Sequence, residues 1–149
     1  MDNNKIITCS MTMEKREELL RRAGKYLETR EEILFAYAHG SFVEAPYFRD
    51  LDIGVFLRQE DVKTIRYTYE IGLEDALEKI LSVTFPLEVR LLNSASIAFR
   101  YRAIRGRLLV DRAPDLRADF CMRVISRYLD IKPILLYHTR EAFTYEARS

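Results

Sequence analysis

The hydrophobic residues of this chain recur with a helical period in four segments. Residues 14–28 and 61–81 place apolar side chains three to four positions apart with charged residues between them, which predicts two amphipathic helices. A shorter helix is expected over residues 95–104. Residues 114–145 repeat the helical pattern after a proline at the favourable first position, and Pro133 is expected to kink or restart this last helix.

Hydrophobic runs of a different kind separate these helices and predict strands. Residues 33–38 form a short apolar, partly aromatic run that ends at His39. Residues 51–57 alternate, so that aliphatic side chains face a core while the opposite face carries an acid. Residues 87–92 alternate in the same way, and a small edge strand or hairpin partner is expected at residues 108–110.

The order of elements is helix, strand, strand, helix, strand, helix, short strand and helix. This order predicts a mixed α/β (α+β) fold, in which helices back a small mixed sheet and a helical segment follows at the C-terminus. A chain of 149 residues is long enough to bury one full core, and it contains no repeat, low-complexity tract or linker. We therefore expect residues 1–149 to form a single domain.

The composition is that of an ordinary globular protein, with 48% hydrophobic and 32% charged residues. A net charge of +1 argues against a protein whose main role is to coat nucleic acid. No run approaches the roughly 18 apolar residues that a membrane span requires, and residues 1–13 lack the apolar core of a secretory signal. Cys9 and Cys121 lie far apart and outside any metal-binding spacing, so we expect reduced thiols and a cytoplasmic location.

A local cluster of arginines occupies residues 100–112, where Asp111 is the opposing acid. The cluster has two interpretations: a solvated face, or a docking surface for a phosphate-bearing or acidic partner. Its members are Arg100, Arg102, Arg105, Arg107 and Arg112.

Acidic residues that follow a glycine–serine pair carry the main chemical signal. Asp50 and Asp52 stand two positions apart at the start of a strand, so their side chains point to one face, roughly 6.6–6.8 Å apart along the chain. Divalent cations in two-metal sites lie about 3.5–4 Å apart and prefer carboxylate oxygens. Gly40 and Ser41 can bring backbone N–H groups and a hydroxyl close to a phosphate, and Glu88 supplies a third acid. Together these residues predict a metal-dependent site for nucleotide phosphates.

Gly40–Ser41 followed by Asp50–Leu51–Asp52 resembles the Gly-Ser … Asp-x-Asp signature of the DNA polymerase beta-type nucleotidyltransferases. Residues 87–93, which read Leu-Glu-Val-Arg-Leu-Leu-Asn, lie where that family carries its third acid, in a strand that ends in Leu-Asn. More narrowly, the chain resembles the small single-domain minimal nucleotidyltransferases. The likeness runs from about residue 14 to the C-terminus.

This resemblance implies transfer of a nucleoside monophosphate, most simply AMP from ATP, to a hydroxyl group with release of pyrophosphate. Asp50, Asp52 and Glu88 would be the catalytic residues and the ligands of two Mg²⁺ ions. The residues that would bind the nucleotide are Gly40, Ser41 and Arg90.

The resemblance also bears on the acceptor and the partner. The acceptor hydroxyl could belong to a small molecule, an RNA end or a protein tyrosine. By analogy with the family, a small helical HEPN-type protein would be the partner, and this chain would be the antitoxin of a toxin–antitoxin pair. A homo-oligomer is also possible.

Three departures from the family pattern keep a non-enzymatic alternative open. Residues 42–46 read Phe-Val-Glu-Ala-Pro where the family has Ala-Arg-Gly, so the customary arginine is missing. The segment between the glycine–serine pair and the first aspartate is also shorter than usual. Arg49 stands where a serine is typical, and the third acid is Glu88 rather than an aspartate. These differences suit a catalytically degenerate module that binds nucleotide or neutralises a partner. A nucleic-acid binder that uses the arginine cluster is a third alternative.

Overall fold

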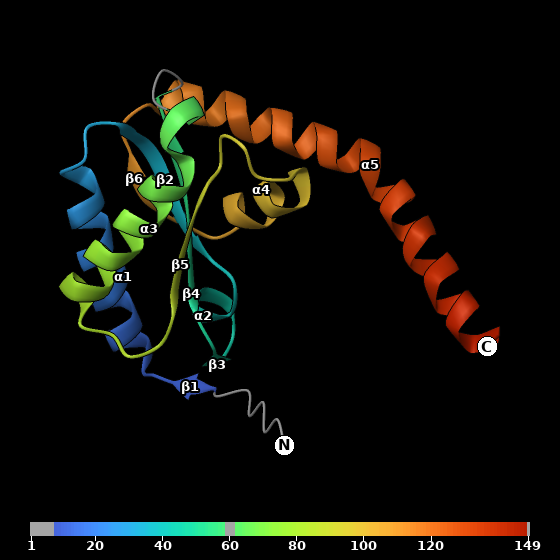
Figure 1. Ribbon diagram of the computed structural model, residues 1–149, viewed down its shortest axis with the longest axis horizontal. Helices are drawn as coiled ribbons and strands as arrows, with labels where there is room; N and C mark the ends of the chain where they lie inside the picture. The colour runs from blue at the N-terminus through green and yellow to red at the C-terminus, as the bar shows by residue number, and fades with distance from the viewer. Residues whose placement is uncertain (1–7, 59–61, 149) are drawn as a thin grey trace.

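A four-stranded mixed sheet forms the centre of the computed structural model, which describes residues 8–58 and 62–148 (Figure 1). The strands are β2 (Ile33–His39), β4 (Leu51–Leu57), β5 (Leu87–Leu91) and β6 (Arg107–Asp111). β2 pairs antiparallel with both β4 and β6, whereas β5 pairs parallel with β4. The sheet order is β5-β4-β2-β6, so the predicted edge strand is confirmed.

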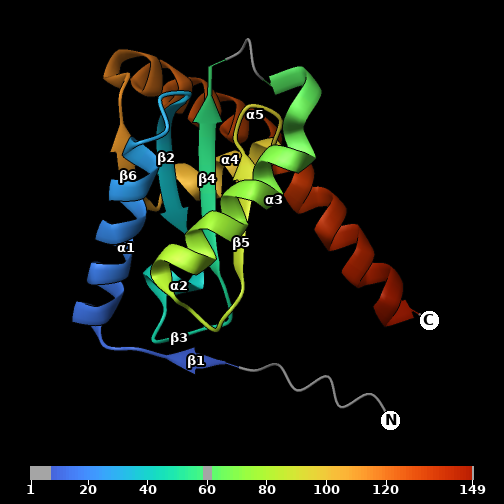
Figure 2. The same ribbon diagram turned by 60° about the vertical axis from the view of Figure 1, so that its left-hand side comes forward.

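Helices cover both faces of this sheet. α1 (Met13–Glu28) and α3 (Val62–Leu81) lie against one face, and α4 (Ile97–Ile104) and α5 (Pro114–Arg148) lie on the other (Figure 1; Figure 2). The parallel pairing of β4 and β5 requires a crossover connection, which α3 provides. This layered arrangement confirms the mixed α/β (α+β) class with a small helix-backed sheet.

Short elements connect the sheet to the loop that carries the glycine–serine pair. α2 (Ser41–Glu44) is a single helical turn that begins at Ser41. β3 (Tyr47–Phe48) follows it and pairs antiparallel with β1 (Cys9–Ser10). Neither α2 nor β3 is long enough to show a hydrophobic period, so periodicity in the sequence does not predict them.

Two layers of buried side chains hold the sheet between its helices. The larger layer lies under α1 and α3 and is mainly aliphatic, with Ile53 and Val55 contributed by β4. The smaller layer lies under α4 and α5 and is aromatic: Phe35 stacks on Phe56 with ring centroids 4.7 Å apart, and Phe120 of α5 packs against both rings. The predicted alternation of residues 51–57 is therefore confirmed, with both faces of the strand buried beyond its acidic end.

Carboxylates from α3 satisfy the outer edge of β5. Glu74 Oε1 accepts a hydrogen bond from the backbone N–H of Val89 at 2.9 Å, and Glu70 Oε1 accepts one from Leu91 at 3.0 Å. An unpaired strand edge is a place where other chains can add a strand, and these side chains occupy its N–H groups. The strand that carries Glu88 is thus fixed on both sides.

The last helix continues through Pro133 rather than restarting there. Figure 1 shows α5 bending along its length, as a proline inside a helix requires. Its first half packs on α4, where the rings of Tyr101 and Tyr128 stack with centroids 3.8 Å apart. Over the described residues, neither α5 nor any other helix combines the length and the apolarity needed to cross a membrane.

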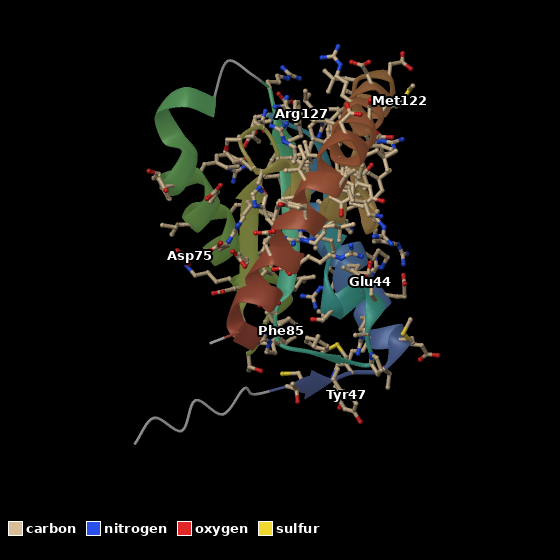
Figure 3. All side chains as sticks on the ribbon, turned by 90° about the vertical axis from the view of Figure 1, so that its right-hand side faces the viewer. Glu44, Tyr47, Asp75, Phe85, Met122 and Arg127 are labelled. Atoms are coloured by element: carbon tan, nitrogen blue, oxygen red, sulfur yellow. The ribbon has the colours of Figure 1, made fainter. Side chains whose placement is uncertain are left out.

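The second half of α5 leaves the body of the protein. Every side chain from residue 132 to residue 142 is exposed. Figure 3 shows α5 running in front of the sheet. In its first half, the outward side is also exposed: Met122, which the figure labels, is 73% exposed. The helix is therefore packed along one part of its length and surrounded by solvent along the other.

Candidate functional site

Neighbouring strands bring the three predicted acids together. Asp50 immediately precedes β4, Asp52 is the second residue of β4, and Glu88 is the second residue of β5. Because the two strands run parallel with Asp52 opposite Glu88, both side chains leave the sheet on the same face. One oxygen from each of the three carboxylates lies within 4.8 Å of the others. The expectation that these acids converge is confirmed.

A cavity of about 380 Å³ opens beside the acids. Asp52 and Glu88 line it, together with Gly40 from the end of β2 and Phe99 from α4. Its volume falls within the range of about 300–1,000 Å³ that is typical of small-molecule sites. The cavity is therefore large enough to receive the phosphates of a nucleotide next to the carboxylates.

Gly40 connects β2 to α2 in a conformation that favours glycine. Its φ is 84° and its ψ is −160°. A Cβ atom at this position would lie 2.7 Å from Oδ2 of Asp52, closer than van der Waals contact allows. The missing side chain lets the backbone approach the acid. Ser41 begins α2 beside it and is not part of the cavity lining.

Arg90 lies on the same strand face as Glu88 and is bound to it. Its Nε and Nη2 atoms are each 2.8 Å from Oε1 of Glu88, and its guanidinium carbon lies 5.2 Å from the ring centroid of Phe99. The side chains of Arg90 and Glu88 are 55% and 44% exposed, so the pair adds little to stability. Its chemical effect is to neutralise part of the charge of Glu88 and to fix its orientation.

The carboxyl group of Asp52 has a raised pKa. Its pKa is raised from 3.8 to about 6, first by burial and then by the charges of Asp50 and Glu88, while Arg90 opposes the change. Between these two pH values the folded protein holds a proton that the unfolded chain releases. The metal-free protein therefore loses stability as the pH rises through that window. A divalent cation among these hard oxygen ligands would relieve the repulsion, so the residues fit such an ion.

Binding of Mg²⁺ should weaken as the pH falls below about 6, by up to about tenfold for each pH unit, because a proton on Asp52 competes with the metal. Isothermal titration calorimetry between about pH 5 and about pH 8 measures this dependence. Asp75→Asn, which removes an exposed acid of α3, is the matched control and should keep the wild-type profile. An affinity that is constant over this pH range would contradict a metal site at Asp52.

A buried arginine organises the loop that follows Gly40. Arg16 of α1 is 5% exposed, and its guanidinium lies 4.9 Å from the ring centroid of Phe48. It donates hydrogen bonds to four backbone carbonyls at distances of 2.5–3.2 Å, which belong to Met11, Phe42, Ala45 and Pro46. The charge of Arg16 is thus solvated by the backbone of the loop, and α1 fixes the path from the glycine–serine pair to the first acid.

The motifs of acids and glycines do not indicate Arg16, although the sequence contains a signal for it. Residues on the buried face of α1 recur at helical spacing, and Arg16 stands one turn before Leu19 and Leu20 on that face. A charged residue at a position where the pattern predicts an apolar side chain indicates a buried guanidinium with dedicated acceptors.

His39 adds an uncharged polar group to the cavity lining. Its side chain is 4% exposed, and its ring meets that of Phe99 edge-on with centroids 4.9 Å apart. Burial lowers the pKa of His39 to about 4, and the nearby charge of Arg102 lowers it too, so the imidazole is neutral at pH 7. Within the described part of the chain, its Nε2 atom has no hydrogen-bond partner.

Solved structures share this fold. A complex of the tri-AMPylated HEPN toxin of Shewanella oneidensis with MNT antitoxin has a TM-score of 0.59 and 18% identity, over 90% of this chain and 99% of that chain. The MntA–HepT toxin–antitoxin structure has a TM-score of 0.57 and 17% identity, over 93% and 100% of the two chains. A toxin–antitoxin structure with AMP-PNP has a TM-score of 0.56 and 20% identity over the same shares. At these identities the likeness establishes the fold.

Comparison of the sequence with known proteins identifies the family as well as the fold. No curated protein sequence matches the chain significantly. A profile of the family described as "Polymerase beta, Nucleotidyltransferase" matches residues 22–115. This segment is more than half of the 149 residues and runs from α1 to the start of α5, so it contains the converging acids and Gly40. The chain therefore belongs to the polymerase beta-type nucleotidyltransferase family.

Proposed function

We propose that this protein transfers AMP from ATP to a hydroxyl group of a protein acceptor and releases pyrophosphate. The observation that carries the proposal is the convergence of oxygens from Asp50, Asp52 and Glu88 within 4.8 Å. These acids adjoin a cavity of about 380 Å³ in a member of a nucleotidyltransferase family. Carboxylates arranged in this way suit two Mg²⁺ ions.

Each residue of the site has a role in this reaction. When bound, the Mg²⁺ ions would supply the positive charge that lowers the barrier to attack on the α-phosphate. Asp50 and Asp52 would hold them. Glu88, oriented by Arg90, would complete the ligand set and accept the proton of the attacking hydroxyl. Gly40 leaves room for phosphate oxygens against the backbone. Ser41 follows at the start of α2, outside the cavity lining, and would bind a phosphate oxygen through its backbone N–H or hydroxyl.

The acceptor in this proposal is a tyrosine hydroxyl of a HEPN-type toxin, and the chain would act as its antitoxin. The support is that structures with the same fold contain an AMPylated HEPN toxin bound to an MNT antitoxin, or AMP-PNP.

A second candidate function is a non-catalytic module that binds nucleotide or neutralises a partner. The ion pair between Arg90 and Glu88 favours it, because a carboxylate already bound to a guanidinium is a weaker ligand for a cation. In this case nucleotide would bind without turnover, even when the partner is present.

Transfer of label from ATP to a copurified partner tests the proposal. The wild-type protein with Mg²⁺ should label the partner, and the Asp50→Asn, Asp52→Asn double variant should lose at least about 1,000-fold in rate, because two of the three carboxylate ligands lose their charge. Asp75→Asn should retain the wild-type rate, since Asp75 is an exposed acid of α3. Equal rates for the wild type and the double variant would refute the proposal. Calorimetric binding of ATP without transfer would favour the non-catalytic module.

A further inference from the structure

The arginines of residues 100–112 do not form one surface. Three of them bind other parts of the protein and two do not. Arg102 of α4 and Arg105, which directly follows that helix, line the cavity beside the acids, and they have no hydrogen bond or ion pair within the described residues. The three bound arginines are Arg100, on the carbonyls of Leu92 and Asn93, Arg107, on Glu17, and Arg112, on the carbonyls of Glu28 and Ile33.

The two unpaired guanidiniums lie on aromatic rings of α4. The guanidinium carbon of Arg102 is 5.9 Å from the ring centroid of Phe99, and that of Arg105 is 5.4 Å from the ring centroid of Tyr101. Such contacts orient a guanidinium but leave its N–H donors free. Both arginines are exposed, so their donors are available to a ligand that enters the cavity.

The same cavity contains a buried donor or acceptor without a partner. His39 is 4% exposed, lines the cavity, and its Nε2 atom makes no hydrogen bond to any described residue. Buried polar atoms in native proteins are nearly always paired with protein, water or ligand, so this nitrogen of the cavity lining is available to a group that enters the cavity. Phe99 packs against both groups: its ring centroid lies 4.9 Å from that of His39 and 5.9 Å from the guanidinium carbon of Arg102.

We infer that Arg102, Arg105 and His39 form the subsite for the polyphosphate tail of the substrate, the part that leaves as pyrophosphate. This inference rests on the proposed nucleotidyl transfer. It assigns the site two chemically different parts: the carboxylates of Asp50, Asp52 and Glu88, and the guanidinium groups of Arg102 and Arg105 beside the neutral imidazole of His39.

The chemistry of the transfer adds negative charge to the part of the substrate that leaves, and cations in the cavity would stabilise that charge. The acceptor oxygen forms a bond to the α-phosphorus, the bond from that phosphorus to the bridging oxygen breaks, and the electron pair goes to pyrophosphate, which gains negative charge. Three carboxylates alone would repel this product. Guanidinium groups bind phosphate oxygens through paired N–H donors, and preorganised donors that stabilise developing charge lower the barrier.

Glu44 is a further charged group in the cavity lining and has to be included in this balance. It belongs to α2 and is exposed, and Figure 3 labels its side chain. Its single negative charge is opposed by two guanidiniums, so these three side chains together remain cationic. Arg90 does not contribute to this balance because it is bound to Glu88.

Binding measurements on the intact protein test the subsite. The Arg102→Ala, Arg105→Ala double variant should bind ATP and inorganic pyrophosphate at least about 30-fold more weakly in the presence of Mg²⁺, because charge-assisted hydrogen bonds are lost. Its affinity for AMP should stay within about twofold of the wild-type value, since AMP lacks the tail. Arg123→Ala is the matched control: the Arg123 side chain is 81% exposed and paired with Asp119 on α5. Circular dichroism shows whether each variant is folded.

The outcomes separate this inference from the proposed function. If the double variant transfers AMP and binds ATP as the wild type does, the subsite is wrong and the transfer stands. If it loses ATP and AMP affinity equally, the subsite is wrong, and label transfer by the wild type decides the proposed function separately. If the wild type transfers nothing yet binds pyrophosphate through the two arginines, the subsite stands and the transfer is wrong. His39→Phe, which removes the nitrogen and keeps a ring against Phe99, should raise the KM for ATP more than it lowers kcat.

Discussion

Replacing Arg16 with alanine should lower the free energy of unfolding by about 3–4 kcal/mol, as measured by urea denaturation. The guanidinium is the donor for four backbone carbonyls that are buried or partly buried. Each carbonyl left unsatisfied costs about 1–3 kcal/mol, and water that enters the truncated site recovers part of this loss. The loop from α2 to β3 should therefore lose its anchor on α1.

Two further variants make this result specific. Arg16→Lys keeps the charge but not the planar set of donors, so its free energy of unfolding should lie between that of the wild type and that of Arg16→Ala. Arg123→Ala removes an exposed arginine from α5 and should change the free energy of unfolding by less than about 0.5 kcal/mol. A loss below about 1 kcal/mol for Arg16→Ala would show that the loop does not depend on this residue.

Replacing Gly40 with alanine should reduce the rate of AMP transfer by at least about 100-fold. The new methyl group would lie 2.7 Å from Oδ2 of Asp52, and the positive φ of 84° is strained for any residue with a Cβ atom. Asp52 would have to move, and with it the oxygen that approaches Asp50 and Glu88. The measurement is the same label-transfer rate, together with Mg²⁺ affinity from calorimetry.

Gly72 offers the matched control because no atom lies within 4 Å of a Cβ built at that position in α3. Gly72→Ala should leave transfer unchanged and stabilise the protein by about 0.5–1 kcal/mol through higher helix propensity. If Gly40→Ala transferred AMP at the wild-type rate, the close approach of backbone and acid would have no catalytic importance.

Much of the fold follows from hydrophobic spacing. The alternation of residues 51–57 places Ile53 and Val55 in one layer and Phe56 in the other, and the structure agrees. The convergence of Asp52 and Glu88 also follows from the sequence, because two short strands in one small sheet have few ways to present acids on a common face. Hydrophobic patterns within single strands and helices were therefore sufficient to predict these elements and the faces on which their side chains lie.

Contacts between distant segments were not predictable in this way. The pairing of Arg16 with the carbonyls after Gly40 joins residues up to 30 positions apart. The division of the arginine cluster, with Arg102 and Arg105 in the cavity and Arg107 on Glu17, depends on where α4 and β6 lie against the sheet. Charge in the sequence showed that these groups exist, but only the packing of the helices shows which of them remain unpaired.

The solvent-exposed half of α5 has a consequence for the behaviour of the protein on warming. A helix in water is costly to start and nearly neutral to extend, so the packed turns before Pro133 act as the nucleus for the exposed turns of residues 132–142. The side chains of these outer turns are exposed, so burial adds little to the small gain of each backbone bond. Their backbone amides should exchange with deuterium long before those of the sheet, and the mean length of the helix should shorten gradually below the melting temperature.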